Sequence, residues 1–481
     1  MTGTTTSGAT AGTANGRTAA TTSGATAGSG ATAGSAGGAT TTQIFLASTP
    51  YGTATLAAAI DSGSFPPADR RILLASNNAT TPETTPALTE SPVLDRLRTR
   101  FDDVLDWNAT IAPMHPGGWT PRADDVPLWE RQLRREWGIA ADERLSLVLE
   151  SLQVAPAQAV AQLFPDAPID VYADGLMSYG PTRNKLDPLV GGRVRRLLHL
   201  DLVPGLRPLL LREFGVEPEL VPTESFLKVL AELTEDAGDA GDLAEPSEQP
   251  ALLLGQYLSA LSILTPEEEE ELHVRMLRGA VARGHRRVVF KPHPSAPARW
   301  SHLLEREAEA LGAQLTVFDA PLLAEVLFRR LRPALVVGCF STALFTAHAL
   351  YGIPVARVGT EVLLERLTPY ENSNRIPVTL ADALLPDLEG AGDGVLPETD
   401  PAPLVAAVGY AMQPQILASR RADAEEYLRE RYLRERFARR YFKRRRLTAL
   451  GLPGGLPRRL AFVPRNPTVR RLARHARKVL H

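Results

Sequence analysis

The sequence has 481 residues, which is too long for one ordinary hydrophobic core, so we expect two domains with additional segments. Its 53 Lys and Arg residues nearly balance 55 Asp and Glu residues, and the formal net charge of −2 argues against a general nucleic-acid binder. A hydrophobic content of 44% excludes disorder of the whole chain, and the single cysteine, Cys339, excludes an internal disulfide framework and a cysteine-rich metal site.

Residues 1–42 consist of Ser, Thr, Gly and Ala, except at Met1, Asn15 and Arg17. Side chains this small bury little surface and do not offset the entropy that is lost on ordering, so we predict a disordered low-complexity tail. The segment does not show the basic and apolar regions of a signal peptide. No apolar run in the sequence reaches the roughly 18–20 residues that span a bilayer.

Short apolar runs alternate with helical stretches across residues 43–240. The predicted strands are 44–47, 71–75, 145–152 and 169–172, and the predicted helices are 53–60 and 157–163. This alternation is typical of a parallel sheet built from βαβ units, so the sequence predicts an N-terminal, acceptor-side Rossmann-like domain.

An acidic segment rich in small residues, 236–250, predicts a domain boundary. A second alternation follows and defines a nucleotide-sugar-binding domain over residues 250–390. Its predicted strands are 251–254, 287–290, 315–318, 334–337 and 355–358, and its predicted helices are 266–283, 300–311, 322–328 and 342–350. Two Rossmann-like domains in tandem predict the GT-B glycosyltransferase architecture, an α/β fold with an interdomain cleft. We expect residues 391–442 to form helices that pack on this core.

The predicted strand 287–290 is followed by Lys291-Pro292-His293-Pro294. In open α/β sheets, ligands bind at the carboxyl ends of strands. The prolines restrict the backbone around His293, whose ordinary pKa near 6.5 suits donation of a proton or a hydrogen bond to an anion. Lys291 adds positive charge, so Lys291, His293 and Pro294 are candidate site residues. A rigid turn without a catalytic role is the alternative interpretation.

Ser341 and Thr342 follow the predicted strand 334–337 and begin a helix. A helix N-terminus favours phosphate because its N–H groups are unpaired and its end is partly positive, although a plain helix cap uses the same residues. With His293 at the end of another strand of the same sheet, the pair predicts a phosphate clamp. Gly255 and Gln256, after strand 251–254, are further candidates for donor binding.

Asp174-Gly175 follows the predicted strand 169–172 of the first domain. A carboxylate at this place can take a proton from an attacking hydroxyl, although Asp-Gly is also a common turn. Tyr179 and Arg183 are candidate substrate-binding residues, because arginine forms bidentate pairs with carboxylates. The histidines do not have metal-ligand spacing, so we predict no required metal.

Taken in the order in which they occur along the chain, these three motifs resemble those of the bacterial α-2,8-polysialyltransferase-like family, which is related to lipooligosaccharide sialyltransferases. That family carries two acidic residues before a glycine, then His-Pro, then Ser followed by Ser or Thr. The corresponding residues here are Ala173-Asp174-Gly175, His293-Pro294 and Ser341-Thr342, within a similarity that covers roughly residues 43–380.

The resemblance implies transfer of sialic acid, or a related nonulosonic acid, from CMP-sialic acid to a glycan hydroxyl, with inversion and without a metal or cofactor. It implies that Asp174 deprotonates the acceptor, that His293 supports the departing phosphate, and that Ser341 and Thr342 hold it. Ala173 departs from the family pattern, which has an acidic residue there. Two alternatives therefore stay open: a CDP-glycerol-type teichoic acid transferase, and a non-catalytic relative that acts as a membrane-associated binding subunit.

Residues 420–481 contain 20 Lys or Arg residues and 5 Asp or Glu residues, interleaved with aromatic and leucine side chains. Basic amphipathic segments bind anionic membrane surfaces. We therefore predict contact of residues 420–481 with such a surface, with a basic tail at 443–481, in a cytoplasmic protein peripheral to the inner face of the plasma membrane. Nucleic acid is the less favoured partner. The net charge of −2 is thus a cancellation between an acidic body and a basic C-terminal segment.

Overall fold

The computed structural model describes residues 40–173, 175–235, 249–293, 299–390 and 400–456. All of them fall within one compact unit, Ala39–His481. Most of the predicted tail 1–42 and of the predicted boundary 236–250 lies outside the described residues. The first strand begins at Thr41 and thus includes the last two residues of the predicted tail, and Thr42 and Gln43 are buried in the strand.

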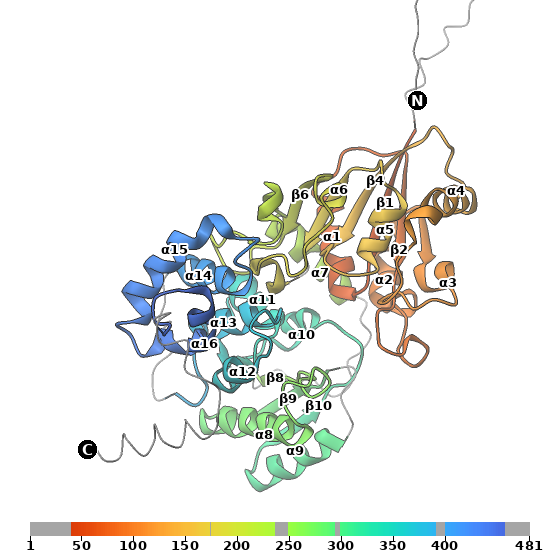
Figure 1. The fold of residues 1–481 in the computed structure, drawn as a ribbon. Helices are drawn as coiled ribbons and strands as arrows, with labels where there is room; N and C mark the ends of the chain where they lie inside the picture. The colour runs from red at the N-terminus through yellow and green to blue at the C-terminus, as the bar shows by residue number, and fades with distance from the viewer. Residues whose placement is uncertain (1–39, 174, 236–248, 294–298, 391–399, 457–481) are drawn as a thin grey trace, which may run out of the picture. The chain divides into compact units, whose positions relative to one another are not determined.

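The first sheet contains the strands of the N-terminal half, which are β1 (Thr41–Ala47), β2 (Arg70–Ala75), β3 (Asp103–Asp106), β4 (Arg144–Glu150), β5 (Ile169–Ala173), β6 (Val194–His199) and β7 (Glu217–Leu220). The accompanying helices are α1 (Pro50–Asp61), α2 (Pro92–Leu97), α3 (Trp107–Ile111), α4 (Val126–Glu136), α5 (Ala157–Leu163), α6 (Pro188–Gly191) and α7 (Thr223–Glu235). The order is β3-β2-β1-β4-β5-β6-β7, and every pair is parallel. The order reverses between β1 and β4 (Figure 1).

The second sheet contains β8 (Ala251–Leu254), β9 (Arg287–Lys291), β10 (Gln314–Val317), β11 (Leu335–Gly338) and β12 (Val355–Arg357). Its helices are α8 (Pro266–Ala282), α9 (Arg299–Ala310), α10 (Ala324–Leu331), α11 (Thr342–Tyr351) and α12 (Thr360–Arg366). This sheet is also parallel, in the order β10-β9-β8-β11-β12, and its order reverses between β8 and β11. In open α/β sheets, such reversal points are where ligands bind.

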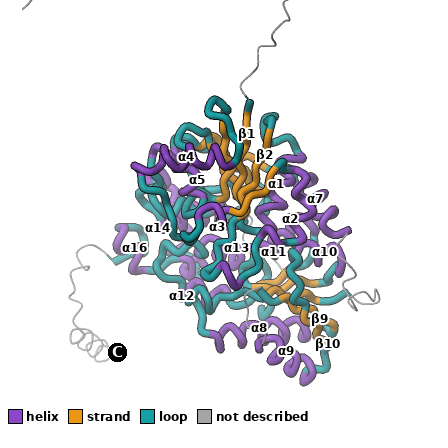
Figure 2. The backbone as a smooth tube through the Cα atoms, turned by 90° about the vertical axis from the view of Figure 1, so that its right-hand side faces the viewer, coloured by secondary structure: helices purple, strands orange, loops and turns teal. Residues whose placement is uncertain are grey.

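Alternate residues of the first sheet enter two different hydrophobic cores. In β1, Ile44 and Leu46 face one core, while Phe45 and Ala47 face the other. Helices α4 and α5 cover the first of these faces, and α1 and α7 cover the second (Figure 2). Because both faces are buried, the strands read as continuous apolar runs, as the sequence predicts for a parallel sheet.

Polar residues directly after strands fix where the neighbouring helices begin. The Thr49 side chain accepts a hydrogen bond from the Gly52 N–H at the start of α1, and Ser341 does the same for the Ala343 N–H at the start of α11. Thr265 and Glu268 form a capping box at α8. These caps satisfy N–H groups that have no partner within the helix, and those at α1 and α11 place the helix N-termini at the carboxyl edges of the sheets.

The C-terminal residues form α13 (Arg375–Leu384), α14 (Ala402–Met412), α15 (Arg421–Tyr427) and α16 (Arg444–Leu450). Tyr427, Tyr432, Tyr441 and Phe442 are buried in the main core. Leu447 in α16 is also fully buried, so residues 443–456 pack on the folded body and do not form the predicted basic tail from residue 443. Among the described residues, no helix is long and apolar enough to cross a membrane.

Candidate functional site

The carboxyl ends of β8 and β11 are joined by a side chain at the reversal point of the second sheet. Gln256 Oε1 accepts a hydrogen bond of 3.0 Å from the Phe340 N–H, in the turn just before Ser341. The Gly255 N–H donates to the Lys291 carbonyl oxygen at 2.9 Å, which joins β8 to β9. Three sequence motifs that are far apart in the chain are therefore held at one edge of the sheet.

The neighbours of Gly255 leave little room for a larger side chain, whereas its backbone conformation is open to other residues. A Cβ atom at this position would lie 3.0 Å from Phe290 Cζ and 3.2 Å from Pro292 Cα. The predicted direct contact of Gly255 and Gln256 with a nucleotide therefore stays a prediction. What the structure shows is that Gln256 holds the loop that carries Ser341, and that Gly255 packs against the end of β9.

Lys291 and His293 lie on either side of Pro292 at the end of β9 but have different surroundings. The Lys291 ammonium is half-buried and donates to the Ala320 carbonyl oxygen at 3.3 Å. Burial lowers the pKa of Lys291. Close by, burial raises the pKa of the Glu325 carboxyl to about 7, and the Lys291 charge acts in the opposite direction.

His293 is exposed, and its ring centroid lies 6.2 Å from that of Tyr257. Desolvation by the surrounding protein, and then the charge of Lys291, lower the pKa of His293 below its ordinary value. The imidazole is therefore neutral near pH 7, and a neutral ring has one N–H group that donates a hydrogen bond. Pro294 lies outside the described residues.

Ser341 and Thr342 form the beginning of α11. The Ser341 hydroxyl oxygen accepts the Ala343 N–H at 3.3 Å, which leaves the hydroxyl proton for a ligand. The helix runs for ten residues, so its N-terminal N–H groups and its dipole favour an anion here. Two residues before Ser341, Cys339 is fully buried, and burial raises the pKa of its thiol.

Gly175, the second residue of the Asp174-Gly175 motif, lies against the beginning of α11. A Cβ atom added to Gly175 would lie only 2.7 Å from Thr342 Oγ1, so these two residues are in close contact. The hydroxyl of Tyr51 in α1 lies 3.3 Å from Thr346 Oγ1, one turn further along α11. These contacts bring the carboxyl edges of the two sheets together. Asp174 itself lies outside the described residues.

Tyr179 does not have the position that the predicted substrate contact requires. Its side chain is fully buried, and its hydroxyl accepts the Val203 N–H at 3.2 Å. Burial raises its pKa to about 12. The turn from Leu176 to Tyr179 directs the ring into the core, so this residue supports the turn after Asp174-Gly175 rather than contacting a ligand.

Arg183 is half-buried, and its backbone is fixed on both sides. Its N–H donates to Gln153 Oε1 at 2.7 Å, and its carbonyl oxygen accepts from Gln413 Nε2 at 2.7 Å. Within the described residues, its guanidinium makes no hydrogen bond or ion pair, and burial lowers its pKa. Arginine nevertheless stays charged, so this side chain has the properties expected of a group that binds an anionic ligand.

Glu150 is a further candidate site residue, which the sequence reasoning missed. It ends β4, beside β1 at the reversal point of the first sheet, and pairs in register with Tyr172. Its Oε2 accepts hydrogen bonds from the Ser48 N–H at 3.0 Å and from the Ser48 hydroxyl at 2.7 Å. A carboxylate thus lies at the strand end next to β5, which leads into Asp174. No group of three or more His, Cys, Asp or Glu residues suited to a metal occurs in the described part of the chain.

Comparison of the sequence with protein families identifies the family to which this chain belongs. Residues 43–360 match the family described as alpha-2,8-polysialyltransferase. The chain belongs to this family. It is therefore a sialyltransferase-like glycosyltransferase, and its two parallel α/β sheets confirm the predicted GT-B fold class.

No curated protein matches the sequence of this polysialyltransferase-family protein. Among solved structures, the GT-B domain of a sialyltransferase from Photobacterium damselae is 13% identical over 71% of this chain and 96% of that chain, with a TM-score of 0.37. A UDP-GlcNAc 2-epimerase from Methanocaldococcus jannaschii is 12% identical over 74% of this chain and 95% of that chain, with a TM-score of 0.42. The family assignment rests on the sequence match alone.

Proposed function

We propose that this protein transfers sialic acid, or a related nonulosonic acid, from a CMP-activated donor to a glycan hydroxyl, with inversion and without a metal. The observation that carries the proposal is the contact between Gly175 and Thr342. It brings the motif of the predicted base to the helix N-terminus that would hold the donor phosphate. Acceptor activation and leaving-group stabilisation, the two requirements of the transfer, then occur on opposite sides of one reacting centre.

The departing CMP carries a phosphate that gains negative charge as the bond to the sugar breaks. The Ser341 and Thr342 hydroxyls and the N-terminus of α11 stabilise this charge, because donors aimed at a developing anion lower the barrier. His293 acts on the same phosphate as a neutral hydrogen-bond donor, in agreement with its lowered pKa. Gln256 and Lys291 act indirectly, by fixing the Ser341 loop and by keeping His293 neutral.

Asp174 is the proposed general base, as the family resemblance implies. Glu150 supplies a second carboxylate at the neighbouring strand end, at a position fixed by Ser48. It is therefore the residue best placed to substitute for the acidic group that Ala173 does not provide. Arg183 is proposed to bind the carboxylate of the donor sugar, because its half-buried charge has no acidic partner among the described residues.

The test is release of CMP from CMP-N-acetylneuraminic acid by the full chain, with and without glycan acceptors. We expect His293→Ala to lower the rate at least 100-fold, within the range of about 10²–10³ for removal of one donor that stabilises a developing anion. The matched control is His302→Ala, which removes an exposed histidine of α9. Equal rates for the wild type and His293→Ala would overturn the assignment. Preferential stabilisation by CDP-glycerol would favour the teichoic acid alternative, and failure to bind any cytidine nucleotide would favour a non-catalytic relative.

We further propose that the protein is peripheral to an anionic membrane surface on the cytoplasmic side. Arg434, Arg436, Arg444 and Arg445 are exposed, and none has an acidic partner within the described residues. This proposal involves only the exposed arginines. The aromatic side chains, which the sequence also suggested for membrane contact, are buried in the structure. Co-sedimentation with phosphatidylserine vesicles is expected at low salt and not with phosphatidylcholine vesicles. Substitution of the four arginines by glutamate should weaken it, and unchanged co-sedimentation would refute the proposal.

A further inference from the structure

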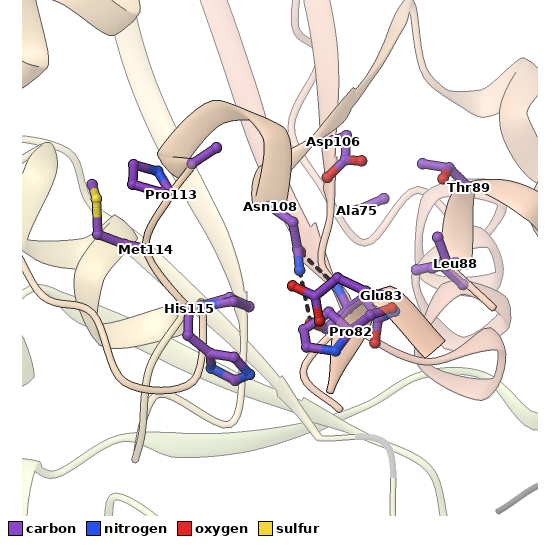
Figure 3. Close-up of a pocket in the computed structure, with 14 residues that line it drawn as sticks. Ala75, Pro82, Glu83, Leu88, Thr89, Asp106, Asn108, Pro113, Met114 and His115 are labelled. Atoms are coloured by element: carbon purple, nitrogen blue, oxygen red, sulfur yellow. Dashed lines mark hydrogen bonds between the residues drawn. The ribbon is translucent and has the colours of Figure 1, made fainter. Parts of the chain in front are cut away.

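A cavity of about 300 Å³ lies at the carboxyl ends of β2 and β3 in the first sheet. Ala75 and Asp106, the last residues of these two strands, are partners in register and both line it. Figure 3 shows His115 on one side of the cavity and Glu83 on the other. This volume is at the lower end of the range for small-molecule sites, so the cavity has room for about one sugar ring.

The walls of the cavity are fixed by hydrogen bonds within the protein. Asn108 Nδ2 donates to the Asn77 carbonyl oxygen at 3.0 Å, and Asn108 Oδ1 accepts the Asn77 N–H at 2.9 Å. His115 Nδ1 accepts the Gly117 N–H at 3.1 Å, so the proton is on Nε2, which donates to the Ala79 carbonyl oxygen at 2.9 Å. The imidazole thereby joins two loops, and the cavity is formed before a ligand arrives.

The charge of the cavity is negative. Glu83 and Asp106 are exposed carboxylates, and no Lys or Arg is among the lining residues. The remaining surface is largely apolar and includes Leu88, Pro113 and Met114. A sugar ring satisfies both features, because its hydroxyls donate to the carboxylates while its C–H face packs on the apolar side chains. An acidic sugar brings a third negative charge and is repelled.

The cavity is distant from the transfer site. Strand β2 is separated from β5, which leads into Asp174-Gly175, by β1 and β4. Three spacings of about 4.8 Å place the two strand ends roughly 14 Å apart. One monosaccharide does not reach both positions, so a ligand that does so is an oligosaccharide.

We propose that this cavity binds an uncharged sugar unit of an oligosaccharide acceptor, at a distance from the hydroxyl that is sialylated, and that Glu83 and Asp106 exclude acidic sugars from it. The acceptor role rests on the proposed function, whereas binding in the cavity is measurable without turnover. The sugar preference thus differs from what the family name would lead one to expect, which is an acidic polysialic acid chain.

The test measures binding of a panel of neutral oligosaccharides, including lacto-N-neotetraose, and of a trimer of α-2,8-linked sialic acid, by saturation-transfer NMR and calorimetry. The wild type should bind a neutral member and not the trimer. Glu83→Gln combined with Asp106→Asn should weaken neutral binding at least tenfold, and asparagine keeps the cap that Asp106 provides to Ala109. Glu83→Lys should allow the trimer to bind. The matched control is Glu90→Gln, which removes a nearby exposed charge that does not line the cavity.

Binding of the trimer to the wild type as tightly as a neutral sugar, unchanged neutral binding in the double variant, or no binding of any neutral member would each overturn the proposal. In transfer assays, the double variant should raise the KM for an oligosaccharide acceptor and leave kcat unchanged. If no CMP is released from the donor by any variant, the proposed function fails, whereas the binding result still tests whether the cavity binds a neutral sugar. If CMP is released and the variants do not alter neutral binding, only the cavity proposal fails.

Discussion

The contact between Gly175 and Thr342 gives a prediction with a defined magnitude. The backbone at Gly175 is extended, with φ of −176°, so an alanine there costs no backbone strain. Its Cβ atom, however, would lie 2.7 Å from Thr342 Oγ1, whereas ordinary contacts begin at 3.4 Å. Relief of such an overlap in a packed site typically costs about 1–3 kcal/mol. We therefore expect Gly175→Ala to destabilise the protein through this one contact.

A double-mutant cycle isolates the contact. Thr342→Ala removes Oγ1 and Cγ2, and the nearest remaining atom of residue 342, Cβ, is 3.7 Å from the added methyl group. In that background, Gly175→Ala should be neutral, so the coupling free energy should be about 1–3 kcal/mol. Gly118→Ala is the matched control, because no atom lies within 4 Å of its added Cβ.

The assay is thermal unfolding of the four proteins of the cycle in one buffer. For a domain of 150–250 residues, about 1 kcal/mol corresponds to roughly 2–4 °C in Tm, so a difference of several degrees between the two backgrounds is expected. Equal losses of Tm from Gly175→Ala in both backgrounds would refute the reasoning, because the motif would then not lie against α11.

Three further predictions concern titration and proton transfer. If His293 acts as a neutral donor, the rate of CMP release should rise with pH through the lowered pKa of His293. Lys291→Met should move this rise to higher pH, because it removes a positive neighbour that lowers the pKa of His293. A rate that falls through the same pKa would contradict the role. Asp174→Asn should lower kcat by about 10²–10⁴-fold and Glu150→Gln by less, and the reverse order, measured in the same assay, would make Glu150 the base. Burial raises the pKa of Glu325 from 4.5 to about 7, so the stability of the folded state should fall as pH rises from about 4.5 to 7. Glu325→Gln should flatten this pH dependence in thermal unfolding, and an unchanged slope would refute the prediction.

The central strands of both sheets follow from the sequence because they are buried on both faces. The apolar runs at β1, β2, β8 and β11 therefore give strong signals. The outer strands of the first sheet do not. Residues 194–199 contain Arg195 and Arg196, whose guanidiniums pair with Asp170, and the edge strand β7 contains Pro218. Such strands have no continuous apolar run, so they were not predicted.

The strand-end motifs were predictable because the carboxyl edge of a parallel sheet is where ligands bind, but side-chain directions were not. Tyr179 is close to Asp174 in sequence, yet a short turn directs it into the core. Glu150 was missed because the apolar Leu152 extends the pattern of the strand. Ser151 and Leu152 have φ of 53° and 40°, so the chain leaves the strand directly after the carboxylate.

The buried thiol of Cys339 has a practical consequence. It is the sole cysteine of the sequence, and it lies in the turn before Ser341, which we propose binds the donor. A fully buried thiol with a raised pKa reacts with a disulfide reagent only when this turn opens. A nucleotide that binds at α11, as we propose, would stabilise the closed turn and slow the reaction in proportion to its occupancy. The rate of thiol modification therefore reports occupancy of the donor site in the unaltered protein, without an engineered label.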